Sequence, residues 1–102
     1  MSDCLFCTIA EGGIPADVVH SDDEVLAFRD VNPQAPVHVL VIPRAHHATA
    51  SELATADPAL AGRLLAVAGE IAAREGVEAS GYRIVTNTGD SAGQSVHHVH
   101  FH

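Results

Sequence analysis

A single long amphipathic helix in the second half of the chain constrains the fold more than any other feature of the sequence. Asp57 and Pro58 supply an N-cap and a proline at the first helical position. From there until Gly76, apolar residues recur at helical spacing and give the helix one apolar face. Such a face is buried only against a second layer of structure. The apolar face of the helix consists of Leu60, Leu64, Val67, Ala68 and Ile71, while Arg63, Glu70 and Arg74 form the opposite, solvated face.

Short segments with strand character precede and follow this helix in the sequence and can supply the second layer. Residues 25–29 (VLAFR) and 38–42 (HVLVI) are typical strands, and two prolines in the loop between them prevent regular pairing there. We therefore predict one α+β domain over residues 1–102, with a short N-terminal helix and the long helix packed on a five-stranded antiparallel sheet. The remaining predicted elements are the short helix over 6–11 and strands over 17–20, 82–86 and 95–102.

The charge of the chain excludes several kinds of partner. The formal net charge is −8, lysine is absent and the five arginines are scattered, so no basic stripe exists for a nucleic-acid polymer. A small anionic ligand remains compatible with this charge, because a few backbone N–H groups and neutral side chains can hold one phosphate. The first residues carry acidic rather than basic charge and no long apolar run, so we expect neither a signal peptide nor a membrane span. We expect a cytoplasmic protein without nucleic-acid or membrane partners.

Three histidines alternate with apolar residues at the end of the chain. His98, His100 and His102 are separated by Val99 and Phe101, which is the period-2 pattern of a strand with two different faces. The imidazoles are therefore expected on one face, about 6.5–7 Å apart along the strand, with the apolar residues toward the core. Such a row is unnecessary for folding and costly to bury without partners. It indicates a phosphate-handling or metal site.

Two cysteines near the N-terminus are a second feature with chemical potential. Cys4 and Cys7 form a C-x-x-C motif, which closes readily on one metal ion, although a zinc site requires two further ligands. In a reducing compartment such a pair consists either of metal ligands or of redox thiols. The spacing alone does not decide between these two interpretations.

Taken together, these motifs resemble the histidine triad family, specifically its Hint-like branch of the bacterial, zinc-containing type. The final segment GQSVHHVHFH is similar to the family signature, in which G-Q-S-V precedes three alternating histidines. The segments FRDVNPQAP, HVLVIPRAH and GYRIVTN occur in the family's order and spacing, so the resemblance spans essentially the whole chain. It implies the HIT-like fold and a hydrolase that acts on nucleotide conjugates.

The resemblance implies that the last histidines carry the chemistry. His100 is similar to the nucleophile that attacks the α-phosphorus and forms a histidine–nucleotidyl intermediate, which water then cleaves. In the family a backbone carbonyl holds its other ring nitrogen, which leaves the attacking nitrogen unprotonated. His102 resembles the histidine that contacts the phosphate, and Ser95 resembles the serine near the leaving amine.

A nucleotide pocket is also implied by the resemblance. Asp30 matches the acid that binds the ribose hydroxyls, although this residue could equally bond its own backbone in a turn. The apolar residues at base-enclosing positions would by themselves be interpreted as core residues. Those positions are Phe6, Ile9, Phe28 and Val31, and the polar positions around the phosphate are Asn87, Gly93, Gln94 and Ser95.

For the cysteine pair, the resemblance implies a structural zinc ion. Many bacterial members of the family complete a tetrahedral site with a histidine after the V-I-P strand and with the first histidine of the triad. In this chain these residues are His46 and His98, with the adjacent His47 as the alternative to His46. A closed Cys2His2 shell leaves no position for water, so the zinc would stabilise the domain without a part in catalysis. A reduced thiol pair is the other interpretation.

The implied function is that of a homodimeric purine nucleoside phosphoramidase, which hydrolyses the P–N bond of adenosine or guanosine phosphoramidates and related conjugates and releases AMP or GMP. Three alternatives remain. They are a dinucleoside polyphosphate hydrolase of the Fhit-like type, which the G-Q-S-V segment disfavours, a non-catalytic nucleotide-binding or regulatory module, and a zinc-storage or scaffold protein. The family signature continues past its third histidine into a C-terminal tail, whereas this sequence ends at His102 and has His97 where an aromatic residue is usual.

Overall fold

Three antiparallel strands form the central sheet of the protein. In the computed structural model, which describes residues 4–102, β1 (Val18–Ser21), β2 (Val25–Arg29) and β3 (Val39–Pro43) pair in the order β1-β2-β3. The three predicted strands before the long helix are therefore confirmed to within one residue at each end. Residues 1–3 of the predicted domain lie outside the described part of the chain.

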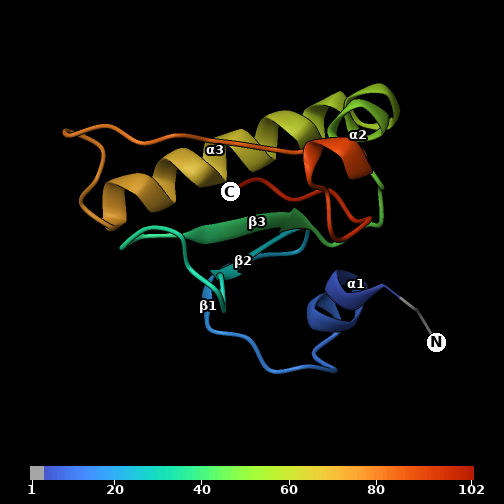
Figure 1. Ribbon diagram of the computed structural model, residues 1–102, viewed down its shortest axis with the longest axis horizontal. Coiled ribbons are helices and arrows are strands. Elements are labelled where there is room, and N and C mark those ends of the chain that lie inside the picture. The colour runs from blue at the N-terminus through green and yellow to red at the C-terminus, as the bar shows by residue number, and fades with distance from the viewer. Residues whose placement is uncertain (1–3) are drawn as a thin grey trace.

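Both faces of this sheet are buried, and the alternation of side chains along each strand divides the core in two. On β2, Val25 and Ala27 belong to one core cluster, while Leu26 and Phe28 belong to the other. The long helix covers the first face and the short N-terminal helix lies below the second, as Figure 1 shows. Because both faces are covered, four of the five residues of β2 are buried.

Two of the three α-helices in residues 4–102 match the sequence prediction. They are the short α1 (Leu5–Ala10) and the long α3 (Pro58–Arg74). The Asp57 carboxylate accepts a hydrogen bond from the backbone N–H of Leu60 at 3.1 Å, so it caps α3 as predicted. The apolar face of α3 packs on the sheet, and Leu64 in its middle is fully buried.

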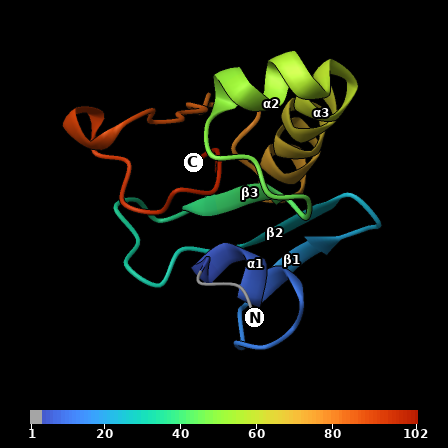
Figure 2. The same cartoon turned by 90° about the vertical axis from the view of Figure 1, so that its right-hand side faces the viewer.

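A third helix, α2 (Ala50–Ala56), is absent from the predicted elements. The Thr49 hydroxyl caps it by accepting a hydrogen bond from the Glu52 backbone N–H at 3.2 Å, and this T-x-x-E spacing is the signature of a capping box. Leu53 is the buried residue of α2 and joins the core beneath α3. The two helices follow one another directly through Asp57, as Figure 2 shows.

The predicted five-stranded sheet is wrong, because the last two predicted strands form no continuous ladder within residues 4–102. Phe101 exchanges both backbone hydrogen bonds with Val41 of β3, at 2.9 and 3.0 Å. His102 does the same with Val85, at 2.7 and 2.9 Å. Each contact is a single residue pair, whereas a strand in a sheet requires a run of consecutive pairs.

The segment over residues 95–102 nevertheless runs beside β3 (Figure 2) and has two distinct faces. Val99 and Phe101 are buried in the core beneath α3. The imidazoles of His98 and His100 contact Phe6, which belongs to the opposite core cluster. The period-2 pattern of the sequence therefore defines which side chains face the core, even where it does not produce a regular strand.

Candidate functional site

His98 is held so that one ring nitrogen faces the two cysteines. Its side chain is fully buried, and its Nε2–H donates to the carbonyl oxygen of Pro43 at 2.8 Å. Since a carbonyl can only accept, the proton lies on Nε2, and the Nδ1 lone pair faces Cys4 Sγ at 3.3 Å and Cys7 Sγ at 3.4 Å. Burial, the largest cause, lowers the pKa of His98. The imidazole is thus neutral, as metal ligation requires.

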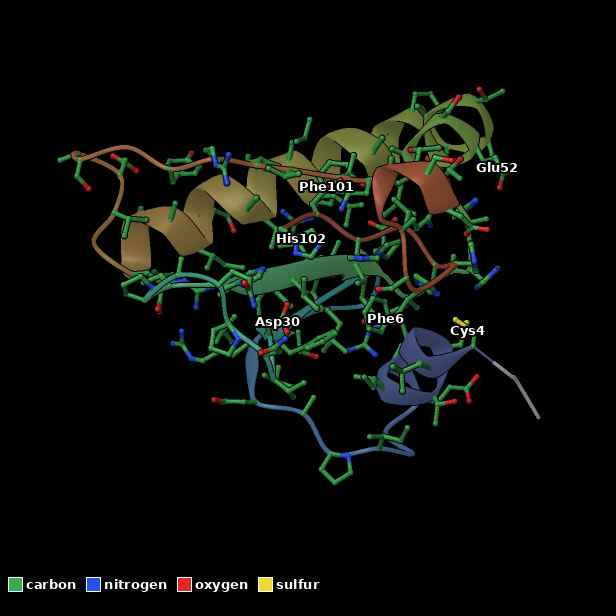
Figure 3. All side chains as sticks on the ribbon, viewed as in Figure 1. Cys4, Phe6, Asp30, Glu52, Phe101 and His102 are labelled. Carbon is green, nitrogen blue, oxygen red and sulfur yellow. The ribbon has the colours of Figure 1, made fainter. Side chains whose placement is uncertain are left out.

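His46 completes a cluster of four potential metal ligands around this nitrogen. Its Nδ1 lies 3.3 Å from Cys7 Sγ and 3.2 Å from His98 Nδ1. Bonds of about 2.0–2.3 Å in a tetrahedral zinc site place neighbouring donor atoms roughly 3.3–3.8 Å apart, so these donors fit such an ion. The sulfur atoms lie at the start of α1 (Figure 3). The cluster is the predicted set Cys4, Cys7, His46 and His98.

The neighbouring His47, the alternative ligand, is not a member of this cluster. Its backbone carbonyl instead accepts a hydrogen bond from the N–H of Val99 at 2.7 Å. The side chain of His46 and the main chain of His47 therefore both connect the loop after β3 to the segment over residues 95–102. Through the cysteines, the same cluster also connects this loop to α1.

His100 is anchored through the opposite ring nitrogen. It is buried, and its Nδ1–H donates to the backbone carbonyl of His98 at 2.8 Å. Nε2 therefore carries the lone pair, and no hydrogen bond within residues 4–102 occupies it. The Phe6 ring packs edge-on against the imidazole, with centroids 5.0 Å apart and planes at 89°. The result is an unprotonated nitrogen with a fixed direction, which is what a nucleophile requires.

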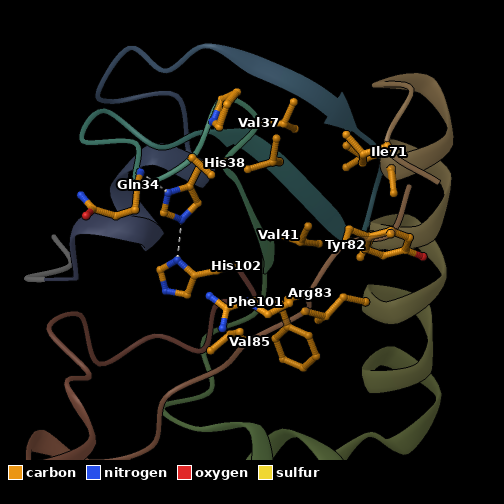
Figure 4. Close-up of a pocket in the computed structure, with 18 residues that line it drawn as sticks. Gln34, Val37, His38, Val41, Ile71, Tyr82, Arg83, Val85, Phe101 and His102 are labelled. Carbon is orange, nitrogen blue, oxygen red and sulfur yellow. Dashed lines mark hydrogen bonds between the residues drawn. The ribbon is translucent and has the colours of Figure 1, made fainter. Parts of the chain in front are cut away.

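His102 receives a hydrogen bond from a short chain that starts in the loop before β3. The Gln34 backbone N–H donates to His38 Nδ1 at 3.0 Å, so the proton of His38 lies on Nε2. This Nε2–H donates to His102 Nδ1 at 2.9 Å (Figure 4). The proton of His102 is consequently on its own Nε2, where it is available as a donor. The rings of His100 and His102 are adjacent, with centroids 5.0 Å apart.

The Asp30 carboxylate lies on the other side of His38, with Oδ2 3.4 Å from His38 Nε2. Asp30, His38 and His102 are close enough to share a metal ion. However, a ligating nitrogen needs a lone pair, and the bond from Gln34 puts a proton on His38 Nε2. We interpret this trio as a hydrogen-bonded group. Burial, with smaller effects of His100 and His38, lowers the pKa of His102, and Asp30 opposes this change.

His38 is a candidate site residue that the sequence prediction lacks. Its ring lies against that of His102, although the two residues are 64 positions apart. The available signal is a polar residue at the start of an otherwise apolar strand-like segment, within one of the stretches that resemble the family. That signal alone does not distinguish a site residue from an ordinary surface or hydrogen-bonded histidine.

The loop over residues 87–97 carries the predicted phosphate positions. Ser95 and Gly93 are exposed, and Asn87 is half-buried. Gly93 has a φ of 88°, a left-handed conformation that side chains other than glycine rarely adopt. Gln94 differs from its neighbours, because it is buried and its amide is hydrogen-bonded inside the protein. The loop therefore presents Ser95 to solvent beside a rigidly held Gln94.

The predicted base-enclosing residues are only partly brought together. The rings of Phe6 and Phe28 pack edge to face with centroids 5.6 Å apart, and Ile9 packs against the same core cluster. Val31 is 99% exposed in the loop after β2, so it encloses nothing in this structure. The Asp30 carboxylate accepts a hydrogen bond from the Asn32 N–H at 2.9 Å, in agreement with the turn interpretation.

A cavity of about 410 Å³ adjoins the pair of His38 and His102 (Figure 4). Apolar side chains of β3, α3, the loop before β3 and residues 82–85 make most of its wall. Neither His100 nor Ser95 lines it. This cavity is therefore a neighbour of the candidate site and does not contain its reactive nitrogen.

Comparison with known proteins identifies the family of this chain. A family model described as the HIT domain matches residues 11–102. The chain belongs to the HIT family. It is 42% identical over 98 residues to the purine nucleoside phosphoramidase of Escherichia coli strain K12, with 96% of this chain and 82% of that protein covered. It is 51% identical to an uncharacterised HIT-like protein of Synechococcus elongatus, over 98% of this chain and 87% of the relative.

Solved structures of HIT proteins share the fold. The HIT family hydrolase from Legionella pneumophila superposes with a TM-score of 0.94 at 47% identity, covering 98% of this chain and 89% of that one. A HIT family hydrolase from Clostridium thermocellum gives a TM-score of 0.95 at 37% identity, with 100% and 89% covered. These matches confirm the family resemblance and the HIT-like α+β fold.

Among residues 4–102, no helix is long and apolar enough to cross a bilayer.

Proposed function

We propose that this protein is a nucleotide-conjugate hydrolase that cleaves the P–N bond of purine nucleoside phosphoramidates and releases AMP or GMP. The observation that carries the proposal is the anchoring of His100, whose Nδ1–H donates to the His98 carbonyl and leaves Nε2 unprotonated. The 42% identity to the E. coli purine nucleoside phosphoramidase supports this substrate class. Structural similarity to HIT family hydrolases supports a hydrolytic reaction.

In the first step, the Nε2 lone pair of His100 attacks the α-phosphorus. The bond from phosphorus to the leaving nitrogen breaks, and the amine departs with that electron pair. The amine takes a proton through the Ser95 hydroxyl, which water then reprotonates. The phosphorylated imidazole keeps its Nδ1–H on the His98 carbonyl, which stabilises the positive charge of the ring.

In the second step, water attacks the same phosphorus, and His100 Nε2 leaves with its electron pair. The water passes one proton to solvent, the nucleoside monophosphate departs, and His100 returns to its starting tautomer. Throughout both steps, the Nε2–H of His102 donates to a non-bridging phosphate oxygen. A preorganised donor of this kind stabilises the charge that develops in the transition state.

We further assign the nucleoside to the side of the site that begins at Asp30. Its half-buried carboxylate is 3.4 Å from His38 and is the proposed partner of the ribose hydroxyls. Val31 is almost fully exposed, so its side chain is accessible to a bound base. The proposed base contacts are Phe6, Ile9, Phe28 and Val31, and the proposed phosphate loop contains Asn87, Gly93, Gln94 and Ser95.

The metal cluster is proposed to hold one structural zinc ion. Two thiolates and two neutral imidazole nitrogens are a donor set that zinc prefers, and His98 already has its second nitrogen bonded to the Pro43 carbonyl. The ion would supply no reaction chemistry, because four protein ligands leave no open position. A reducing, cytoplasmic compartment would suit a site with two thiolates.

A homodimer is proposed through α3 and the edge of residues 82–86. Leu65 and Tyr82 are large apolar residues that are 48% and 47% exposed. Leu65 and Gly69 lie one helical turn apart on α3, and the Tyr82 hydroxyl lies beside Gly69, so these side chains share one surface. Sedimentation should give twice the chain mass for the parent protein and a shift toward the monomer for Leu65→Glu.

The activity is tested by comparing AMP release from an adenosine phosphoramidate and from a diadenosine polyphosphate, with His100→Ala as the matched control. We expect faster release from the phosphoramidate and none from the variant. Faster release from the polyphosphate would move the protein to the other class of hydrolase. Binding of AMP without turnover of either substrate would replace the proposal with a nucleotide-binding module.

A further inference from the structure

Gln94 lies at the phosphate loop, yet the protein itself uses every polar group of its side chain. The residue is only 4% exposed. Its Oε1 accepts a hydrogen bond from the Gly89 N–H at 2.9 Å, and its Nε2 donates to the carbonyl oxygens of Ala48 at 2.7 Å and Val96 at 3.1 Å. An amide nitrogen has two donors, and both are engaged. Turning this amide toward a phosphate would break its bonds to the partly buried carbonyl oxygens of Ala48 and Val96, which is costly.

These bonds connect the loop over residues 87–97 to the segment before α2 and close the loop on itself. Gly89 lies in the turn after Asn87, Ala48 precedes α2, and Val96 leads into the histidine segment. The Gln94 backbone N–H also donates to the Gly89 carbonyl at 3.1 Å, so the two residues are joined twice and the loop between them is closed.

Ser95 follows directly and has the opposite character. It is exposed, and its hydroxyl has no hydrogen-bond partner within residues 4–102. The residues on either side of it, Gln94 and Val96, are bonded to each other through the Gln94 amide at 3.1 Å. Ser95 therefore lies within a short turn that this amide closes.

We propose that Gln94 is a positioning residue, which holds the loop over residues 89–96 in the shape that presents Ser95 to the substrate phosphate and does not itself contact the substrate. The inference rests on the proposed function and changes the expected part of Gln94 in it, from a phosphate donor to an internal support for Ser95. It predicts that the effects of changing Gln94 depend on Ser95.

A double-mutant cycle with Gln94→Met and Ser95→Ala tests this dependence. Methionine keeps the length of the side chain and removes all of its hydrogen bonds. Loss of one donor to the transition state typically reduces kcat by roughly 100-fold, and we expect a loss of kcat/KM of that order for each single variant. The double variant should be no slower than the slower single variant, because both changes remove the same interaction. Multiplication of the two losses would overturn the inference, since independent contacts add in free energy.

A second variant keeps the test decisive if Gln94→Met folds poorly. In Gln94→Glu, an ionised carboxylate would face the carbonyl oxygens of Ala48 and Val96, whereas the protonated acid can donate to one of them. The ratio of kcat/KM between variant and parent should therefore rise as the pH falls from about 8 to 6. Gln94→Met, which cannot titrate, is the matched control and should show a flat ratio. A flat ratio for Gln94→Glu would contradict the internal support.

The outcomes separate the inference from the proposed function. If the parent protein hydrolyses an adenosine phosphoramidate but the losses multiply, only the inference fails. If the parent shows no turnover, the same cycle is measured on the dissociation constant of AMP, where non-multiplicative losses would still support the positioning of Ser95. If the parent neither hydrolyses the substrate nor binds AMP, both proposals fail together.

Discussion

The cluster of four potential metal ligands contains His98, and the candidate active site contains His100, only two residues away. The two histidines differ in which ring nitrogen is hydrogen-bonded to a backbone carbonyl. At the cluster, the Pro43 carbonyl holds Nε2 of His98 and leaves Nδ1 for the thiols. At the candidate active site, the His98 carbonyl holds Nδ1 of His100 and leaves Nε2 with a lone pair, which the proposed function assigns to the substrate. One buried segment thus supplies two ring nitrogens with lone pairs, on opposite ring positions, because the acceptor selects the tautomer.

The same comparison explains why the two sites are expected to respond separately to change. The ring of His98 serves the cluster, while only its main-chain carbonyl serves His100. That part of the main chain is also held by the hydrogen bond from the Val99 N–H to the His47 carbonyl at 2.7 Å. We therefore expect damage to the active site to leave metal binding intact, and loss of metal to affect stability more than catalysis.

The largest effect is expected for His100→Ala. This variant lacks the attacking nitrogen, so kcat should fall by roughly 10⁴-fold or more, as for other residues that form a covalent intermediate. Zinc content should remain equal to that of the parent, because His98 keeps its bond to Pro43. Steady-state kinetics and metal analysis on the same preparation test both statements. Loss of zinc together with activity would break the separation of the two sites.

The next effect is expected for Cys7→Ser or for removal of metal with a chelator. An ion that binds only the folded state stabilises it, by on the order of 4 kcal/mol when its concentration is about a thousandfold above its dissociation constant. Urea unfolding with and without chelator measures this difference, and Cys7→Ser should show little response to the chelator. The protein that remains folded should keep its kcat within about tenfold, since the hydrogen bond from His100 is still made. A larger loss of kcat would mean that the ion also positions the nucleophile.

A smaller effect is expected for His38→Phe. The variant removes the donor that places the proton of His102 on Nε2, so a fraction of His102 would present a lone pair to the phosphate. We expect kcat/KM to fall by roughly 10- to 100-fold, the usual cost of losing the group that orients a site histidine. His38→Gln keeps an N–H donor at a similar position and should retain more activity. Equal rates for the parent and His38→Phe would show that His102 needs no such partner.

The smallest effect concerns pH and stability. Burial lowers the pKa of His102 below the value of about 6.5 expected in the unfolded chain. The unfolded state therefore takes up a proton first, so stability is lost as the pH falls below about 6.5 toward the folded-state pKa. His102→Gln cannot titrate, and its free energy of unfolding should decline less than that of the parent between pH 7 and 5. Urea titrations over this range provide the measurement, and parallel curves would contradict the expectation.

Local signals in the sequence were sufficient for the elements that the chain forms by itself. Asp57 and Pro58 define the start of α3, and the residues of β2 are those of the predicted strand. The helix α2 has a comparable local signal in the T-x-x-E spacing of Thr49 and Glu52. The two predicted strands over residues 82–86 and 95–102 do not form continuous ladders for a different reason. Alternation tells which way Val99 and Phe101 point, but pairing with β3 depends on contacts far apart in sequence, and only a single pair forms.

The candidate site likewise contains some residues that the sequence indicates and others that it does not. The spacing of the cysteines and the alternation of the last histidines, read with the family resemblance, indicate the four members of the metal cluster and the position of His100. No local pattern reveals His38, because its position depends on a backbone donor from Gln34 and an acceptor 64 residues away. Nor does any pattern reveal that the Gln94 amide is bonded inside the protein, since the motif gives residue types and not partners.

The most direct test of the account is to trap the covalent intermediate. The parent protein and His100→Ala would be mixed with an adenosine phosphoramidate, quenched rapidly and measured by intact-protein mass spectrometry, with peptide mapping of any adduct. We predict a transient adenylyl adduct on the peptide that contains His100, lost after hydrolysis and absent from the variant. An adduct on another residue, or undiminished turnover by His100→Ala, would contradict the assignment of the unprotonated Nε2 of His100 as the nucleophile.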